Sequence, residues 1–420
     1  MTEILAKTAV SPIRRRFDDT PQPASVDVIV LAEQPHEPMH CLRPDVIASA
    51  ARDFVNEFAG STLYAVKCNP EPRVLRALWT GGVRHFDCAS PAEIALVRQM
   101  FPEAAIHYMH PVKSRAAIRE AASRYGVSDF VLDSEFELGK ILAETQMLGR
   151  AELGLFVRLA VSNGGTYDLS GKFGAAPADA ARLLADARPF AGRLGLCFHV
   201  GSQCLAPQAY VDALALAADV VLKAGVMVDI IDVGGGFPVS YPDITPPPLA
   251  AYFAEIEGAL DRLGLGDAEL WAEPGRALVA SGTSVVVQVQ LRRGGALYVN
   301  DGVFGSLSDA GAPGFRFPVR LIRPAGDPAS PKLHSFRLFG PTCDSADRME
   351  GPFLLPHDVR EGDWIEIGQL GAYGAALRTA FNGFDRARLV DVSDPPLLTT
   401  PGYAADATRQ TTLRVEGVQG

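Results

Sequence analysis

The sequence predicts an α/β fold, a (β/α)8 TIM-like barrel followed by an all-β domain. Between residues 41 and 281, short apolar runs alternate with stretches that have helical periodicity. Polar residues or glycines follow each apolar run. After residue 281 the pattern changes to strand-like runs with turn-rich gaps, which is typical of an all-β domain. The length of 420 residues suits two domains.

Eight apolar runs predict the barrel strands. In chain order they are TLYAVK, RHFDCAS, IHYMHP, DFVLDS, LFVRLAV, GLCFHVGS, IIDVGGG and LWAEPGR. Stretches such as SPAEIALVRQMF between them predict helices. Active-site groups of such barrels lie at the C-terminal ends of the strands. The residues at those ends are Lys67, Asp87, Arg158, His199, Gly234 to Gly236, and Glu273.

The remaining strands are expected in a β domain. Its predicted strands are SVVVQVQLRR, GALYVNDG, FRLFGP, DWIEIGQLG and ARLVDV. A further run near the N-terminus, VDVIVLAE, is expected to be a strand that joins this sheet. We therefore expect residues 1–40 to join the β domain, residues 41–281 to form the barrel, and residues 282–420 to form the C-terminal β domain.

The composition excludes several classes of protein. A formal charge of −10 disfavours nucleic acid and anionic membranes as partners. The N-terminus lacks the apolar stretch of a signal peptide, and no uncharged run reaches membrane length. The six cysteines form no CxxC pair and have no zinc spacing, so we expect no metal site. A cytoplasmic enzyme with reduced thiols is the expectation.

Lys67 ends an apolar run in LYAVKCNP. Apolar surroundings lower the pKa of a lysine, and a neutral amine can attack an aldehyde carbon. The alternative is a lysine that reaches from a strand end into water.

Three glycines in DVGGGFP and the segment FHVGSQ are candidates for phosphate binding. Uncovered backbone N–H groups at Gly235 and Gly236 can approach an anion, and Ser202 can add a hydroxyl. The spacing is not that of a dinucleotide-binding fingerprint. His199 can stack on a ring or move protons. A tight turn and a core histidine are the plainer interpretations.

EPGR supplies a carboxylate and a guanidinium. Glu273 can face a pyridine nitrogen and keep it protonated, which strengthens an electron sink. Arg276 can bind a phosphate with two parallel hydrogen bonds. Later in the chain, GPTCDSADR offers the thiol of Cys343 beside Asp344, and GAYGAAL offers the hydroxyl of Tyr373. Each motif alone also fits a structural role, but together they match the needs of pyridoxal phosphate.

The motifs also resemble a known family. YAVKCN, FDCAS-AE, KFG, FHVGS, DVGGGFP, EPGR, NDGVFGS, GPTCDSAD and GAYGAA-TAFNGF occur in order over about residues 41–390. This series is similar to that of the ornithine decarboxylases, which are barrel-type pyridoxal-phosphate enzymes of the alanine-racemase-like fold. The resemblance implies that pyridoxal phosphate is bound by Lys67, Asp87, Arg158, His199, Ser202, Gly235, Gly236, Glu273, Gly275, Arg276 and Tyr373. Glu93 matches an acid that supports this site.

The resemblance also implies catalytic and substrate-binding roles. Lys67 matches the lysine that holds the cofactor, and His199 and Glu273 match the groups on its ring face and ring nitrogen. Cys343 and Asp344 match a pair that the partner subunit of a homodimer contributes, where the thiol protonates the intermediate and the acid binds the distal amine. Finally, Lys172 matches a lysine that pairs with Asp347 of the partner subunit.

One loop departs from the family pattern. Animal-type ornithine enzymes have a Tyr-Asp pair after NDGVYGS-like residues, whereas an ungapped count places Ala312 and Pro313 there. Asp309 is the nearest acid and is the expected second substrate ligand, with Arg316 and Arg320 beyond it. The expected reaction is decarboxylation of ornithine to putrescine, with lysine or dual lysine/ornithine use as the alternative.

Three other functions are weighed. A diaminopimelate decarboxylase shares EPGR and the barrel but usually has Cys-Glu-Ser where this chain has Cys343-Asp344-Ser345. A racemase needs a tyrosine as second base, and the Cys343 motif argues against it. A non-enzymatic homologue of the antizyme-inhibitor kind loses cofactor contacts, whereas Lys67, the glycines, Glu273 and Cys343 are all present here.

Overall fold

The computed structural model describes residues 23–403, except residues 150, 163, 168–170 and 325–327. Eight parallel strands close into a barrel, in the order β10-β11-β2-β3-β4-β5-β6-β8. They are β2 (Ser61–Ala65), β3 (His85–Cys88), β4 (Ala105–Tyr108), β5 (Asp129–Leu132), β6 (Gly154–Arg158), β8 (Arg193–Cys197), β10 (Ile230–Asp232) and β11 (Glu269–Ala272). All eight predicted barrel strands are confirmed.

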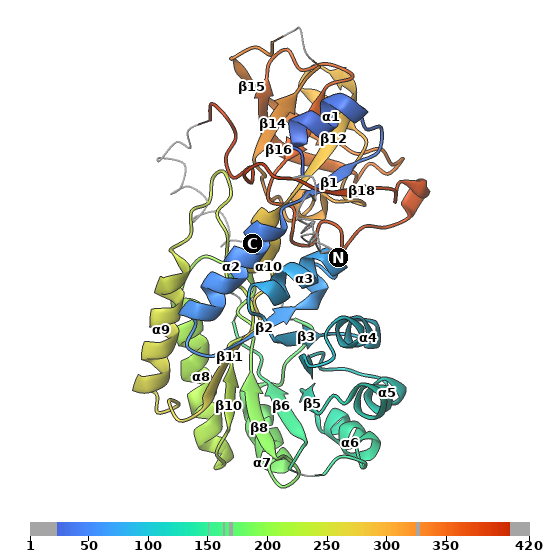
Figure 1. Ribbon diagram of the computed structural model, residues 1–420. Coiled ribbons are helices and arrows are strands. Elements are labelled where there is room, and N and C mark those ends of the chain that lie inside the picture. The colour runs from blue at the N-terminus through green and yellow to red at the C-terminus, as the bar shows by residue number, and fades with distance from the viewer. Residues whose placement is uncertain (1–22, 150, 163, 168–170, 325–327, 404–420) are drawn as a thin grey trace, which may run out of the picture.

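Helices surround the barrel (Figure 1). They are α2 (Pro44–Glu57), α3 (Pro72–Thr80), α4 (Pro91–Met100), α5 (Arg115–Tyr125), α6 (Glu135–Glu144), α7 (Pro177–Ala187), α8 (Gln208–Ala224), α9 (Leu249–Arg262) and the short α10 (Arg276–Val279). Local sequence explains several starts: the hydroxyls of Ser90, Ser114 and Ser134 accept hydrogen bonds from backbone N–H groups in the first turns of α4, α5 and α6. A small hairpin of β7 (Gly165–Tyr167) and β9 (Ser202–Cys204) lies outside the barrel sheet.

Side chains fill the barrel interior. Leu63, Val131, Phe156 and Trp271 are buried there. Gly195 on β8 makes this packing possible, because a Cβ at that position would lie 2.2 Å from the ring of Phe156. The interior is a packed core, so the space for a ligand is at the strand ends.

The β domain is an eight-stranded sheet with the order β14-β17-β12-β13-β15-β16, in which β1 pairs with β12 and with β18. The strands are β1 (Met39–Leu42), β12 (Thr283–Arg293), β13 (Ala296–Val299), β14 (Val319–Ile322), β15 (Leu333–Phe339), β16 (Arg348–Pro356), β17 (Trp364–Ile367) and β18 (Arg388–Asp391). Four one-turn 3-10 helices complete the described elements: η1 (Val66–Cys68), η2 (Ala280–Gly282), η3 (Ser308–Ala310) and η4 (Phe381–Gly383). The five strands predicted after residue 281 are present, and β1, β14 and β16 were not predicted.

One predicted element is wrong. VDVIVLAE forms the helix α1 (Val26–Glu33) instead of a strand. Val26 and Val30 are fully buried against the sheet while Val28 is exposed, which is the spacing of a helix face. The hydroxyl of Ser25 caps the helix. The N-terminal strand of the sheet is β1 instead, which crosses the expected boundary at residue 40.

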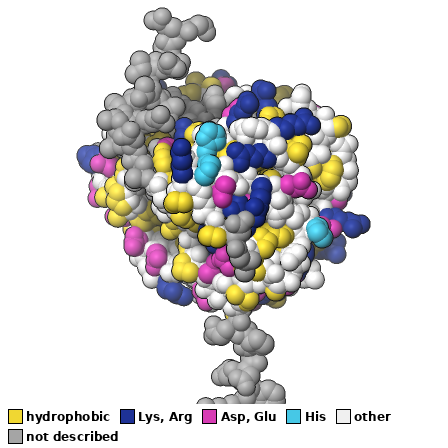
Figure 2. Space-filling model, turned by 90° about the horizontal axis from the view of Figure 1, so that it is seen from above, with side chains coloured by type: hydrophobic (Ala, Val, Ile, Leu, Met, Phe, Trp, Pro, Cys, Tyr) yellow, Lys and Arg dark blue, Asp and Glu magenta, His cyan; other side chains and the backbone are white. Residues whose placement is uncertain are grey.

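The β domain lies above the C-terminal ends of the barrel strands (Figure 1). The contacts that join the two parts there include hydrogen bonds from Tyr373 N–H to Cys68 O at 2.9 Å and from Asn69 Nδ2 to Gly371 O at 2.8 Å. Seen from above, charged side chains of both signs and hydrophobic side chains are interspersed over the surface (Figure 2). No helix in the described ranges combines the length and the apolar character needed to cross a membrane.

Candidate active site

A small cavity lies where the barrel meets the β domain. Its lining residues are Ala65, Lys67, His199, Ser202, Gly235, Gly236, Phe237, Glu273, Gly275, Arg276 and Tyr373. Nine of these eleven are predicted cofactor ligands. The structure thus brings together strand-end residues that are more than 300 positions apart in the chain.

Lys67 lies on η1, directly after β2. Its Nζ is 2.5 Å from Oδ2 of Asp87, which lies on the neighbouring strand β3 beside Ala65. The Asp87 carboxylate is buried, whereas 43% of the Lys67 side chain is exposed. The amine is therefore accessible from the cavity while its counter-ion is fixed in the barrel wall.

The expected lowering of the Lys67 pKa is wrong for the cofactor-free protein. Burial lowers this pKa, but the negative charges of Asp87 and Glu273 outweigh burial and raise it above its usual range. The apolar run around Lys67 is real, but the charges that decide the protonation state come from other strands. The amine is thus an ammonium until another cation or a bound ligand changes its surroundings.

Glu273 and Asp232 form a pair of buried carboxyl groups. Burial raises the pKa of Glu273 well above its usual range, and Asp232 and Asp87 raise it further. Burial also raises the pKa of Asp232 to about 6. A hydrogen bond of 2.8 Å from Gly234 N–H to Asp232 Oδ1 acts in the opposite direction and lowers this pKa. Burial therefore favours the protonated form of Glu273, and a basic ring nitrogen beside it could take that proton.

His199 is a neutral imidazole. Burial, together with the charges of Arg158 and Lys67, lowers its pKa to about 3. Gly201 N–H donates to Nδ1 at 2.9 Å, so Nδ1 is the acceptor and the proton of the neutral ring is on Nε2. An uncharged ring with a fixed tautomer is suited to stacking on an aromatic ligand.

The glycines form a closely packed backbone. A Cβ at Gly235 would lie 2.7 Å from Glu273 O and 3.0 Å from Nε2 of His199. Gly236 has a φ of 106°, and a Cβ there would lie 2.5 Å from Gly201 O. Gly275 approaches Cys68 in the same way, with 3.0 Å from its added Cβ to Cys68 Cβ. Only glycine fits at Gly235 and Gly236, a side chain at Gly275 would be tightly packed, and all three residues line the cavity.

Arg276 is the buried cation of the cavity. Its Nη1 donates to the hydroxyl of Tyr241 at 2.9 Å, and its Nη2 is 2.9 Å from Oδ2 of Asp309. The guanidinium also lies over the rings of Phe315 and Tyr373, at 4.9 and 5.2 Å from their centroids. Within the described residues, the buried Nε of Arg276 has no hydrogen-bond partner. An anion in the cavity would supply one.

Asp309 is not placed as the sequence suggests. The expected second substrate ligand is 5% exposed, and its carboxylate pairs with Arg276. Arg316 pairs with Asp243, and Arg320 pairs with Asp27 and Glu366. The charges of this loop are thus bound within the chain, and Asp309 belongs to the surroundings of Arg276.

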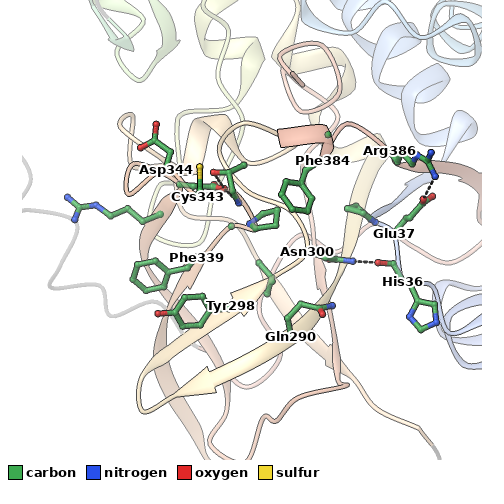
Figure 3. Close-up of a pocket in the computed structure, with 18 of the residues that line it drawn as sticks. His36, Glu37, Gln290, Tyr298, Asn300, Phe339, Cys343, Asp344, Phe384 and Arg386 are labelled. Atoms are coloured by element: carbon green, nitrogen blue, oxygen red, sulfur yellow. Dashed lines mark hydrogen bonds and ion pairs between the residues drawn. The ribbon is translucent and has the colours of Figure 1, made fainter. Parts of the chain in front are cut away.

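Cys343 and Asp344 lie away from the Lys67 cavity. They line a surface groove of the β domain, where they are neighbours on one loop (Figure 3). The Cys343 thiol is exposed, in contrast to the other five cysteines. Among the described residues, the groove and the Lys67 cavity have no lining residue in common.

Asp347 and Asn382 fix the loop that bears Cys343. Oδ2 of Asp347 accepts hydrogen bonds from the N–H and hydroxyl of Thr342, and its Oδ1 accepts one from Val303 N–H. Asn382 Oδ1 accepts a hydrogen bond of 3.1 Å from Cys343 N–H. Asp347 is only 2% exposed. The expected salt bridge between Asp347 and Lys172 of the partner subunit stays a prediction, in which Lys172 would share this carboxylate with Thr342 and Val303.

The remaining predicted residues are Arg158, Glu93 and Ser202. Arg158 ends β6 and acts on His199 and Glu273 through its charge. Glu93 at the start of α4 accepts a hydrogen bond of 2.6 Å from Ala89 N–H, and burial raises its pKa. Ser202 begins β9 and lines the cavity.

The sequence analysis missed Tyr241, Asp232 and Phe315. Asp232 was visible as the first residue of DVGGGFP, and its position at a strand end was the available signal. Tyr241 and Phe315 reach Arg276 from loops, so no periodic pattern marks them.

The cavity fits pyridoxal phosphate. It offers an accessible amine, a neutral imidazole, a carboxyl group whose protonated form burial favours, bare backbone at glycines, and a buried guanidinium with an unused donor. These groups match an aldehyde, an aromatic ring, a ring nitrogen and a phosphate.

Comparisons with known proteins agree with this geometry. The family model of the pyridoxal binding domain of pyridoxal-dependent decarboxylases matches residues 45–280. Ornithine decarboxylase of Mus musculus is 33% identical and covers 80% of this chain and 76% of its own length. Lysine/ornithine decarboxylase of Selenomonas ruminantium is 32% identical and covers 79% of this chain and 84% of its own length.

A solved structure is similar over most of the chain. The lysine/ornithine decarboxylase of Vibrio vulnificus, complexed with putrescine, has a TM-score of 0.74 and is 34% identical. The match covers 87% of this chain and 96% of that chain. The barrel with its β domain and the predicted cofactor are thereby confirmed, and the chain belongs to the pyridoxal-dependent decarboxylases.

Proposed function

We propose that the protein decarboxylates L-ornithine to putrescine and carbon dioxide. The observation that supports this most strongly is the cavity in which Lys67, Glu273, His199 and Arg276 meet. When bound, pyridoxal phosphate supplies an electron sink for the electron pair that remains at Cα after carboxylate loss. The relatives that act on ornithine favour this substrate for the present chain.

The residues of the cavity have separate roles in this proposal. Lys67 holds the cofactor through its aldehyde carbon and later moves protons during product release. Glu273 donates its proton to the ring nitrogen and remains beside it as a carboxylate, which keeps the ring cationic. His199 covers one ring face, and Arg276 binds the phosphate together with Ser202 and the glycine backbone.

A second subunit completes the site in this proposal. The thiol of Cys343 is exposed in a separate groove, so a partner subunit is needed to bring it to the Lys67 cavity. A two-fold symmetric dimer places each loop at the other barrel and forms two equal sites. The thiol then protonates Cα, while Asp344 accepts hydrogen bonds from the distal ammonium of the substrate.

Lysine, alone or together with ornithine, is the alternative substrate. Pro313 stands where the family pattern has its second amine-binding acid, and Asp309 pairs with Arg276 instead. Asp344 is then the acid on which amine recognition depends. One carboxylate on a loop specifies the distance to the amine less strictly than two, which favours use of both chain lengths.

The proposal extends to the compartment and the division of the chain. A reducing compartment, the cytoplasm, keeps the exposed Cys343 thiol in the form that can donate a proton. We keep residues 1–40, 41–281 and 282–420 as the division into N-terminal segment, barrel and β domain, with β1 as the element that crosses the first boundary.

Asp344→Asn tests amine recognition. The exposed carboxylate would no longer compensate the ammonium of the substrate, so we expect KM for ornithine to rise about 10- to 100-fold, as for loss of a charged hydrogen bond. Steady-state kinetics with ornithine and with norvaline, which lacks the distal amine, measure this. Glu350→Gln, a change at another exposed acid, is the control. An unchanged KM for ornithine in Asp344→Asn contradicts the assignment.

A further inference from the structure

Asp309 and Arg276 form a buried ion pair in the cofactor cavity. Nη2 of Arg276 and Oδ2 of Asp309 are 2.9 Å apart, and the two residues are 4% and 5% exposed. A guanidinium so deeply buried needs a negative charge close by, because an uncompensated buried charge strongly destabilises the fold. In the cofactor-free protein, Asp309 provides that charge.

The pair conflicts with the phosphate that the cavity is proposed to bind. A phosphate monoester has a charge between −1.5 and −2 near neutral pH. If Arg276 is its partner, the phosphate enters a site where another anion already neutralises the guanidinium. Two anions then face one cation in poorly solvated surroundings, where charges of the same sign repel each other strongly.

Orientation of Arg276 does not depend on Asp309 alone. The Tyr241 hydroxyl accepts a hydrogen bond from Nη1, and the rings of Phe315 and Tyr373 face the guanidinium. Nε also remains available to a further acceptor. Loss of the Asp309 charge therefore leaves the guanidinium held by three other groups, and the main consequence is electrostatic.

We propose that Asp309 is the counter-ion of Arg276 in the cofactor-free protein and that it weakens phosphate binding by competing for this guanidinium. Asp309 is thus a positioning residue that sets cofactor affinity, and it acts through Arg276. The carboxylate comes from η3 of the β domain, whereas Arg276 begins α10 after the last barrel strand. The ion pair therefore also ties the two parts of the chain together.

Asp309→Asn tests two consequences of the proposal, the affinity for pyridoxal phosphate and the stability of the cofactor-free protein. Asparagine keeps the size of the side chain and removes its charge. We expect the dissociation constant for pyridoxal phosphate to fall about tenfold, because the repulsion is lost. The cofactor-free variant should melt at least about 3 °C lower than the native protein, because Arg276 loses its counter-ion. Visible absorbance of the bound cofactor and thermal unfolding provide the two readouts.

Pyridoxal, which lacks the phosphate, is the matched ligand. The affinity for pyridoxal should be the same in Asp309→Asn and in the native protein. A merely structural defect would instead change the affinities for pyridoxal and for pyridoxal phosphate alike. Asp309→Glu retains the charge and should restore the native ratio of the two affinities. An unchanged or weakened affinity for pyridoxal phosphate in Asp309→Asn overturns the proposal, as does an equal gain for pyridoxal.

Arg276→Gln and the rate of cofactor release provide two further tests. The inference rests on the proposed contact between Arg276 and the phosphate, so Arg276→Gln is tested first. If it leaves the ratio of the two affinities unchanged, the proposed phosphate site fails independently of Asp309. If Asp309→Asn folds only in the presence of cofactor, the rate at which pyridoxal phosphate is released after dilution is measured for the variant and for the native protein. Slower release than from the native protein supports the counter-ion, and equal or faster release overturns it.

Discussion

Lys67→Ala abolishes the visible absorbance of the bound cofactor and lowers the rate of carbon dioxide release by about 10²- to 10⁴-fold. This is the result we expect, because Lys67 offers the accessible amine of the cavity and no other lysine of the described ranges lines it.

The covalent attachment is measured directly. Reduction with borohydride followed by mass spectrometry of peptides should locate the cofactor on Lys67 in the native protein. Lys223→Ala, a change at an exposed lysine of α8, should leave absorbance and activity unchanged. Native-like absorbance in Lys67→Ala, or a label on another lysine, contradicts the role of Lys67.

Hybrid dimers of two inactive variants recover activity. In a mixture of Lys67→Ala and Cys343→Ala chains, the hybrid has one site with both changes and one site with neither. For random reassociation of equal amounts, half of the dimers are hybrids, so about a quarter of the native activity should return. The physical reason is that the exposed thiol and the Lys67 cavity belong to different regions of one chain.

A second mixture is the control for this experiment. Lys67→Ala and Glu273→Ala change the same cavity, so every site in their hybrid retains one defect. This mixture should stay inactive after the same dissociation and reassociation. Sites that each lie within a single chain would give no recovery in either mixture, and that outcome would disprove the shared site.

The sequence predicted the fold and the site best where reactive polar residues directly follow short apolar strands. Each barrel strand is a short buried run that ends in polar residues, so both the strands and most of the cavity lining could be predicted from the order of motifs. Lys67, His199 and Glu273 are brought together because parallel strands all end at one face of a barrel.

Other features depend on contacts that no local pattern records. The run VDVIVLAE is apolar like a strand, but Val26 and Val30 are buried while Val28 between them is exposed, which fits one face of a helix and not one face of a strand. Burial lowers the pKa of Lys67, but Asp87 on β3 and Glu273 just after β11 raise it above its usual range. Asp309 was the nearest acid in sequence to the expected amine site, but the fold places it beside Arg276.

The most direct test of the proposed function is carbon dioxide release from ornithine, lysine, arginine and diaminopimelate, each with pyridoxal phosphate present. The account predicts the highest kcat/KM for ornithine and measurable use of lysine, since Asp344 is the acid left to bind the distal amine. It predicts little release from arginine or diaminopimelate. Release from diaminopimelate or arginine without release from ornithine and lysine would contradict the account.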